Sequence, residues 1–326
     1  MGERNIHRGR LLLLLVLAAA VVCAAGVLFL GWRRRRAAEG AAEAPRRSHP
    51  ARTGARPARP PRQKGKGRWA RRVATGVLAA VAVVCAAGLI GYGWEARQAA
   101  TQFRDLSAQV HAPAVLPAQG GRETDPVPEE DPRPAALEAL QAENGDLAGW
   151  VSIPGTALDY PVMYTPQQPQ YYLHRDFSGA YSYSGTPFLE ERCTLDSDNL
   201  ILWGHNMKAG TMFAGLLRYR DAAYAQAHAW VSFTTPEETR WYQVVAAFAS
   251  EVDAEGDYFR WYNALEFPDP ASFDAFAEGL RASSVLPVPG DLAPGDQFLT
   301  LATCSYHDQN GRFVVVARYS PEGLPG

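Results

Sequence analysis

Eight short β-prone runs, separated by turn residues, are distributed along the C-terminal half of this chain. They are residues 150–153, 159–163, 186–189, 200–203, 230–233, 241–248, 298–303 and 313–319. Runs of this length bounded by Gly, Pro, Asn and Asp are typical of strands, and eight of them in one domain favour a closed or nearly closed barrel. The sequence therefore predicts a mainly β fold with added helices.

Helical patterns lie beside these strands. Residues 134–144 read as a short helix with Pro at its first turn, and residues 269–280 place Phe273 and Phe276 on one face. A shorter helix is expected soon after Asn206. These helices are expected to cover the barrel or to interrupt its connections.

The charges of the chain fall into two opposite halves. Residues 1–72 carry 18 Lys and Arg against three acids, whereas the rest carries 14 Lys and Arg against 31 Asp and Glu. The near-neutral net charge is therefore the sum of a basic N-terminal segment and an acidic remainder, and we expect these two parts in different surroundings. The acidic remainder argues against nucleic-acid binding.

Two uncharged apolar stretches in the basic half, residues 11–32 and 73–94, are each long enough to cross a bilayer as a helix. Between them, residues 33–72 are rich in Lys and Arg and should be disordered and cytoplasmic. We expect residues 73–94 to be the working anchor, with everything after them outside the cell. The first stretch remains open as half of a hairpin, a cleaved signal-like segment or an unused start.

An outward domain is expected to follow this anchor through a tether. Residues 95–133 are polar, rich in Pro and acids in their second half, and are expected to be a spacer without a core. The folded domain is then expected over residues 134–320.

Cysteine usage in the outward part does not suggest a disulfide framework. Cys23 and Cys85 lie in the apolar stretches, which leaves Cys193 in a polar stretch and Cys304 at the end of a β-prone run. Two cysteines make a structural bridge improbable but do not exclude it. No paired Cys or His stands at metal-ligand spacing, so no metal or other cofactor is predicted.

Three polar residues stand at predicted strand ends. Cys304 closes the run 298–304, Arg312 opens the next run, and His205 follows the buried run ending at Trp203. Thiol acyl transfer needs a nucleophile, a proton-transfer partner and a cation for the developing oxyanion. Each residue alone is weak, since a free Cys at a strand end is more often a small core residue. Together they indicate a cysteine-dependent acyl-transfer site.

The motifs around these residues resemble those of sortases, the membrane-anchored cysteine transpeptidases of Gram-positive cell surfaces. Residues 300–304 (TLATC) match the TLxTC signature, and Arg312 stands where the family has its Arg. The rest of the domain resembles class B, with its motifs in order. These are residues 150–156 (WVSIPGT), 160–162 (YPV), 171–173 (YYL), 176–177 (DF), 204–208 (GHNMK) and 212–213 (MF), with the helices at 134–144 and 269–282.

This resemblance implies a sortase-like barrel and a reaction. Cys304 would attack the carbonyl of a C-terminal sorting motif in a surface protein and form a thioacyl enzyme. An amine of a peptidoglycan precursor or a pilin would then resolve it. His205 would be the general acid and base, and Arg312 would stabilise the oxyanion or hold the substrate. The enzyme would lie in the cell membrane with its catalytic domain facing the cell wall.

Some assignments within this resemblance have competitors. His307 lies three residues past Cys304, but in a polar loop, so His205 is preferred; His174 and His228 read as surface residues. Substrate-binding residues implied by the resemblance are Thr303, Ala302, Tyr258 and Leu173. Many class B members have Ser at the Ala302 position, which leaves the sorting motif open.

Two other functions remain open from the sequence. A cysteine endopeptidase would use the same residues with water as the acceptor. A non-catalytic surface binding module would need none of them. Amine-dependent products separate the first alternative from a transpeptidase, and the effect of removing the thiol separates the second.

Overall fold

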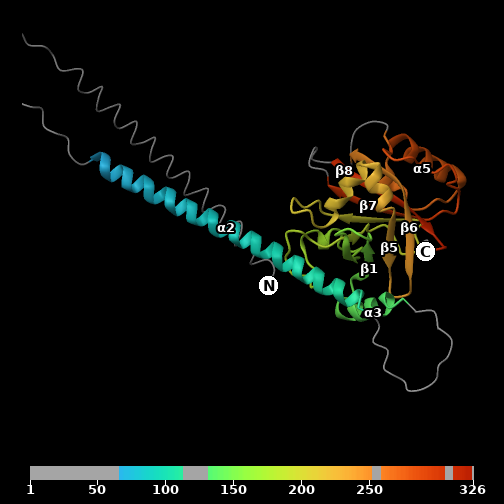
Figure 1. The fold of residues 1–326 in the computed structure, drawn as a ribbon, viewed down its shortest axis with the longest axis horizontal. Helices are drawn as coiled ribbons and strands as arrows, with labels where there is room; N and C mark the ends of the chain where they lie inside the picture. Colours follow the sequence, from blue (N-terminus) through green and yellow to red (C-terminus); the bar gives the residue numbers. More distant parts are fainter. Residues whose placement is uncertain (1–65, 113–130, 252–257, 305–310, 325–326) are drawn as a thin grey trace, which may run out of the picture. The chain divides into compact units, whose positions relative to one another are not determined.

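The computed structural model describes residues 66–112, 131–251, 258–304 and 311–324 (Figure 1). The chain divides into two compact units, Met1–Gly93 and Trp94–Gly326, and each is described by itself. Helix α2 (Lys66–Val110) begins inside the basic segment expected to be disordered. Its window Ala74–Gly91 is, among the described residues, the one stretch of helix long and apolar enough to cross a membrane. The stretch 11–32 lies outside the described residues.

The second unit is built on a closed eight-stranded barrel. Its strands are β1 (Leu147–Ser152), β2 (Asp159–Met163), β3 (Phe188–Leu189), β4 (Asn199–Gly204), β5 (Trp230–Thr234), β6 (Thr239–Glu251), β7 (Phe298–Cys304) and β8 (Gly311–Ser320). Their order around the barrel is β1-β2-β3-β4-β7-β8-β6-β5. Two neighbouring pairs, β2–β3 and β4–β7, are parallel, and the others are antiparallel. The predicted barrel and all eight predicted strands are confirmed.

Helices fill the connections of the barrel. They are α3 (Arg133–Glu143), η1 (Tyr171–His174), η2 (Phe213–Arg220), α4 (Ala222–Ala227), η3 (Trp261–Asn263) and α5 (Pro270–Ser283). Both predicted longer helices are confirmed as α3 and α5, and α5 starts with a capping box made by Asp269 and Ser272. The short helix expected after Asn206 is the 3-10 helix η2.

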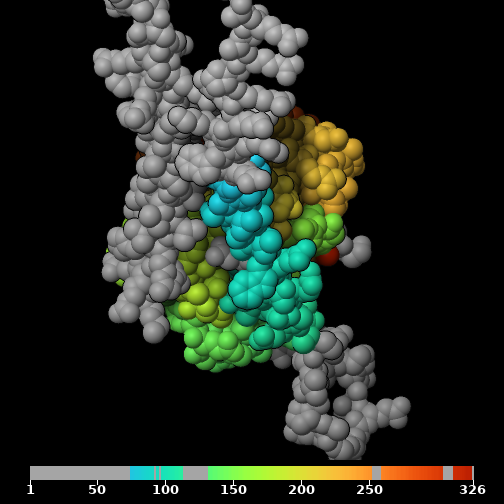
Figure 2. Space-filling view, turned by 90° about the vertical axis from the view of Figure 1, so that its left-hand side faces the viewer, coloured from blue at the N-terminus to red at the C-terminus, as the bar shows by residue number. Residues whose placement is uncertain are grey.

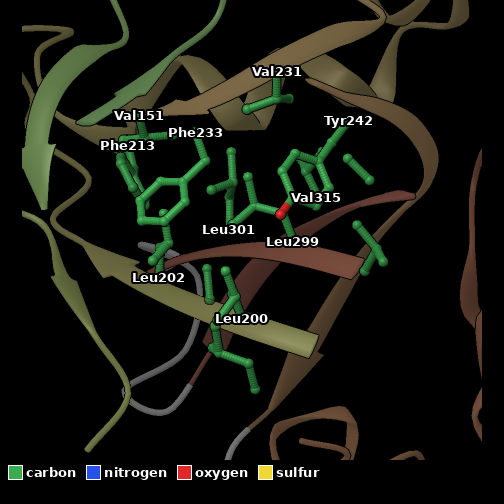
Figure 3. Close-up of a cluster of buried hydrophobic side chains, with 14 of the residues drawn as sticks. Val151, Leu200, Leu202, Phe213, Val231, Phe233, Tyr242, Leu299, Leu301 and Val315 are labelled. Atoms are coloured by element: carbon green, nitrogen blue, oxygen red, sulfur yellow. The ribbon is translucent and has the colours of Figure 1, made fainter. Parts of the chain in front are cut away.

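Alternating inward side chains of the strands make the core, as Figure 3 shows for residues of β1, β4, β5, β6, β7 and β8 with Phe213 of η2. Cys193 also belongs to this core and is fully buried, although its neighbours in the sequence are polar. Its thiol is free, and burial raises its pKa to about 11. A thiol whose pKa is raised this far is not a nucleophile at neutral pH.

The last turns of α2 belong to the barrel domain, which corrects the expected spacer. Residues 95–110 are helical, and Phe103, Leu106 and Val110 are buried in the same core as the strands. Phe103 meets Tyr160 of β2 edge to face, with ring centroids 5.4 Å apart. Figure 2 shows this end of the helix, in teal, against the domain. Three apolar residues at helical spacing were enough to dock a mostly polar segment.

A half-buried carboxylate joins this segment to the barrel. Asp159 of β2 accepts hydrogen bonds from Ser107, from Nε2 of His111 at 3.0 Å and from Nε1 of Trp150 at 2.7 Å. Burial alone would raise the pKa of Asp159, but the bonds from His111, Ser107 and Trp150 outweigh it and lower the pKa. In return, the bond to Asp159 raises the pKa of His111.

The signs of these shifts set a pH window for stability. His111 contributes fully below its ordinary pKa of 6.5 and loses its contribution as pH rises through its raised pKa. Asp159 contributes above its ordinary pKa of 3.8 and loses its contribution as pH falls through its lowered pKa. The contact is therefore strongest between pH 3.8 and 6.5.

Asp159→Asn is expected to destabilise the domain by about 1–3 kcal/mol, because it removes the charge and replaces one of the two oxygens that accept from three donors with an NH2 group. The melting temperature of the full chain in detergent should fall, and its decrease between pH 6 and pH 8 should shrink. The matched control is Asp291→Asn, which removes an exposed carboxylate paired with Arg318 and should change little. Equal losses in the two variants would contradict this account of Asp159.

Candidate active site

Three neighbouring strands bring His205, Cys304 and Arg312 to one edge of the barrel. In the parallel pairing of β4 with β7, Gly204 lies opposite Thr303. The residues that follow these two in the chain are His205 and Cys304. In the antiparallel pairing of β7 with β8, Cys304 lies opposite Arg312. Adjacent strands are about 4.8 Å apart, so the three backbone positions fall within roughly 10 Å.

The chain turns sharply around His205 after it leaves β4. The carbonyl of His205 accepts a hydrogen bond from the Phe213 backbone N–H at 2.9 Å, and Asn206 forms a β-bridge with Met212. The Phe213 ring packs directly on Gly204, where a Cβ would lie only 2.6 Å from the ring. Glycine at 204 therefore allows the packing that fixes the backbone of His205.

The imidazole of His205 is half-buried and held by a backbone carbonyl. Its Nε2 lies 2.9 Å from the carbonyl oxygen of Leu173 in η1. Tyr172, the preceding residue, is buried, and its hydroxyl donates to Asp146 and accepts from Asn144. Helix η1 is thus anchored at the residue next to the carbonyl that bonds to His205.

The loop after η1 contains Gly185, which packs directly against the carbonyl of Leu173. It has φ +60°, and a Cβ there would lie 2.3 Å from the Leu173 oxygen, closer than any side chain tolerates. Next to it, the Thr186 backbone N–H donates to the carbonyl of Tyr172 at 3.0 Å. The loop therefore helps to fix the carbonyl that binds His205.

The surroundings of His205 favour its neutral form. Burial lowers its pKa, the hydrogen bond to the Leu173 carbonyl opposes this, and the nearby His174 lowers it further. The net shift is below the ordinary value. An imidazole that is neutral near pH 7 can accept a proton, as a general base must.

The guanidinium of Arg312 lies over the ring of Trp203. Its guanidinium carbon is 6.0 Å from the centroid of the Trp203 ring, and its Nη1 donates to the Gly311 carbonyl at 3.0 Å. Nε1 of Trp203 in turn donates at 2.8 Å to the buried carboxylate of Glu190. Within the described part of the chain, no carboxylate forms an ion pair with Arg312. A guanidinium can donate hydrogen bonds to an oxyanion or to a substrate carbonyl.

Comparison with known families settles the kind of protein that carries this site. A family model described as a sortase domain matches residues 151–320, which is more than half of the chain. The chain belongs to the sortase family. It is an enzyme of the cysteine transpeptidase kind, as the resemblance implied.

Curated relatives place the chain in class B. Sortase B of Listeria monocytogenes is 30% identical over 183 residues, which cover 55% of this chain and 72% of the relative. Sortase B of Staphylococcus aureus is 28% identical over 186 residues, covering 56% and 73%. The predicted class is therefore confirmed.

Solved sortase B structures share the barrel. A Staphylococcus aureus sortase B–substrate complex superposes with a TM-score of 0.58 at 24% identity, covering 70% of this chain and 98% of that structure. Clostridium perfringens sortase B superposes with a TM-score of 0.51 at 26% identity, covering 56% and 98%. The sortase-like barrel fold expected from the sequence is confirmed.

The residues predicted to bind substrate lie in different settings. Ala302 and Thr303 are buried in β7, whereas Leu173 is half-buried and offers its carbonyl to His205. The hydroxyl of Tyr258 lies 2.9 Å from that of Tyr262. Their contact with a substrate stays a prediction, and His307 lies outside the described residues.

One residue of this sortase site was missed by the sequence reasoning. His174 is exposed, as predicted, but its ring stacks on that of His205 with centroids 5.4 Å apart. It comes from η1, 31 positions before His205, and no local pattern connects the two. Only the helix that carries both Leu173 and His174 brings it there.

Proposed function

We propose that this sortase is a membrane-anchored transpeptidase that cleaves a C-terminal sorting motif of surface proteins and transfers the acyl fragment to an amine. The convergence of Cys304, His205 and Arg312 at the ends of β4, β7 and β8 is the observation that supports it. The acceptor is an amine of the cell wall or of a pilin.

Each residue has one role in the proposed reaction. The Cys304 thiol gives its proton to His205, the resulting thiolate forms a bond to the substrate carbonyl carbon, and Arg312 stabilises the oxyanion. The C–N bond then breaks while protonated His205 gives its proton to the departing amine. The incoming amine attacks the thioester, His205 takes its proton, and the Cys304 thiolate leaves.

The exposed apolar side chains of helix α2 support the proposed membrane anchor. Within the window Ala74–Gly91, the side chains of Leu78, Val83, Leu89 and Ile90 are all exposed. A helix this long can bury such residues in a bilayer. The basic residues before it favour a cytoplasmic N-terminal side, which puts the barrel outside the cell, facing the wall.

Product masses test the reaction. The full chain in detergent is incubated with a peptide library that has Thr fixed at the cleavage position, with and without triglycine. A transpeptidase gives fragments that end in Thr-Gly-Gly-Gly when triglycine is present. Fragments ending in free Thr under both conditions would indicate the endopeptidase instead, and an intact library would sink both enzymatic readings.

A further inference from the structure

Two consecutive residues of η1 contact the same imidazole from different sides. The carbonyl of Leu173 meets the edge of the His205 ring at Nε2, 2.9 Å away. The ring of His174 lies on the face of His205, with centroids 5.4 Å apart and planes inclined by 26°. One short helix therefore constrains both the rotation and the tilt of the proposed acid and base.

The Leu173 contact fixes the tautomer of His205. A carbonyl oxygen can only accept, so Nε2 must carry the hydrogen in the neutral ring. Nδ1 is then the nitrogen that takes up and gives away the catalytic proton. A ring flip would put the Cε1 carbon in place of Nε2 and lose the hydrogen bond to the carbonyl, and the stacked His174 covers one face of the ring against such motion.

The ring of His174 has a second aromatic neighbour besides His205. Tyr181 lies with its centroid 6.4 Å from that of His174 and its plane inclined by 31°. Tyr181 is half-exposed, and His174 is exposed. The three rings form a series from the protein surface to the active site, so His174 is held by aromatic contacts although water reaches it.

His174 also acts on the charge of His205. When His174 is protonated, it sets a like charge against His205 and opposes its protonation, in the same direction as burial. Among the described residues, the register also places Cys304 at the end of β7 and Arg312 on β8 near His205, and Lys208 follows His205 by three positions in the loop after β4. Of all these, His174 is the one whose ring contacts His205 among the described residues.

We propose that His174 is a positioning residue for the transpeptidation reaction. Its ring holds the His205 imidazole in the orientation that the Leu173 carbonyl sets, and its charge, when present, favours the neutral form of His205. This inference rests on the proposed role of His205 as the general acid and base. His174 itself needs no contact with the substrate.

Two substitutions separate the ring from its charge. His174→Ala removes both and is expected to lower kcat about 10-fold or more with little change in KM, because small misplacements of catalytic groups are costly. His174→Phe keeps a stacking ring and should restore most of kcat. In both variants the pKa of His205 should rise, because a like charge has been removed.

His228 provides the matched control. Its ring also lies against an aromatic ring, with 4.3 Å between its centroid and that of Tyr224 and an angle of 49° between the planes, and its Nδ1 lies 3.1 Å from the Pro154 carbonyl oxygen. His228→Ala removes an equivalent set of contacts away from the three strand ends. It should leave kcat, KM and the titration of His205 unchanged.

Kinetics and titration are measured on the full chain in detergent, with histidine pKa values followed by NMR of the imidazole nitrogens. The proposal is overturned if His174→Ala leaves kcat and the His205 titration as in the unmodified protein. It is also overturned if His174→Phe loses as much kcat as His174→Ala. If His205→Ala keeps full activity, the proposed role of His205 as general acid and base is wrong. The titration of His205 in the unmodified protein and in the His174 variants then still shows whether His174 affects its pKa.

Discussion

Cys304→Ala is expected to abolish amine-dependent peptide cleavage, with a loss on the order of 1000-fold or more. Without the thiol no thioacyl intermediate can form, and neither His205 nor Arg312 supplies another nucleophile. The measurement combines product masses with trapping of the acyl enzyme on the intact protein. The variant should accumulate no peptide adduct, whereas the unmodified chain carries one acyl fragment on Cys304.

Cys193→Ala is the control for removing a thiol from this domain. Cys193 is fully buried, and burial raises its pKa to about 11, so it is not expected to react with peptide or with iodoacetamide under native conditions. This variant should lose some stability but keep the acyl adduct. Cleavage that survives Cys304→Ala and disappears with Cys193→Ala would refute the assigned nucleophile.

Arg312→Ala is expected to lower kcat about 100-fold to 1000-fold, the loss typical of a missing oxyanion donor. Arg312→Lys should recover little, because an ammonium has neither the planar fork nor the flat face that lies over Trp203. Steady-state kinetics give kcat and KM, with a library peptide that the enzyme cleaves as the substrate. A rise in KM at constant kcat would show instead that Arg312 binds substrate before the reaction starts.

Arg220 offers a comparable arginine outside the three strand ends. Its guanidinium carbon lies 5.0 Å from the centroid of Phe313, the residue after Arg312, and its side chain is exposed. Arg220→Ala therefore removes a stacked cation of the same kind. It should change kcat by less than a few-fold, and an effect as large as that of Arg312→Ala would point to general electrostatics.

Much of the barrel could be predicted because each strand carries its own signal. The runs that became β4, β7 and β8 are apolar, β-prone and bounded by polar turns, and these properties are local. The two-residue strand β3 was also found, since Phe188 and Leu189 follow a Thr-Pro turn signal. Local pattern, however, does not state which strands become neighbours.

The end of α2 was missed because its docking depends on distant partners. Residues 95–110 are mostly polar, and the few apolar ones matter only because Tyr160 and Asp159 lie where the helix arrives. Similarly, the polar neighbours of Cys193 suggested a surface loop, but the turn folds the thiol inward. In both places tertiary contacts outweighed composition.

The candidate site shows the same division. Residue type and motif singled out Cys304, His205 and Arg312, and the register of β4, β7 and β8 brings their positions together. His174 carries no motif of its own in the sequence reading. Its relation to His205 depends on how η1 is anchored through Tyr172, which no local pattern encodes.

The parallel pairing of β4 with β7 has a consequence for biosynthesis. These strands are far apart in the chain, and Arg312 lies on β8, after both of them, so the three groups cannot meet before β8 has been synthesised. A nascent or truncated chain would carry the cysteine but no working constellation around it. Acylation of the thiol at this site therefore requires that β4, β7 and β8 have already paired.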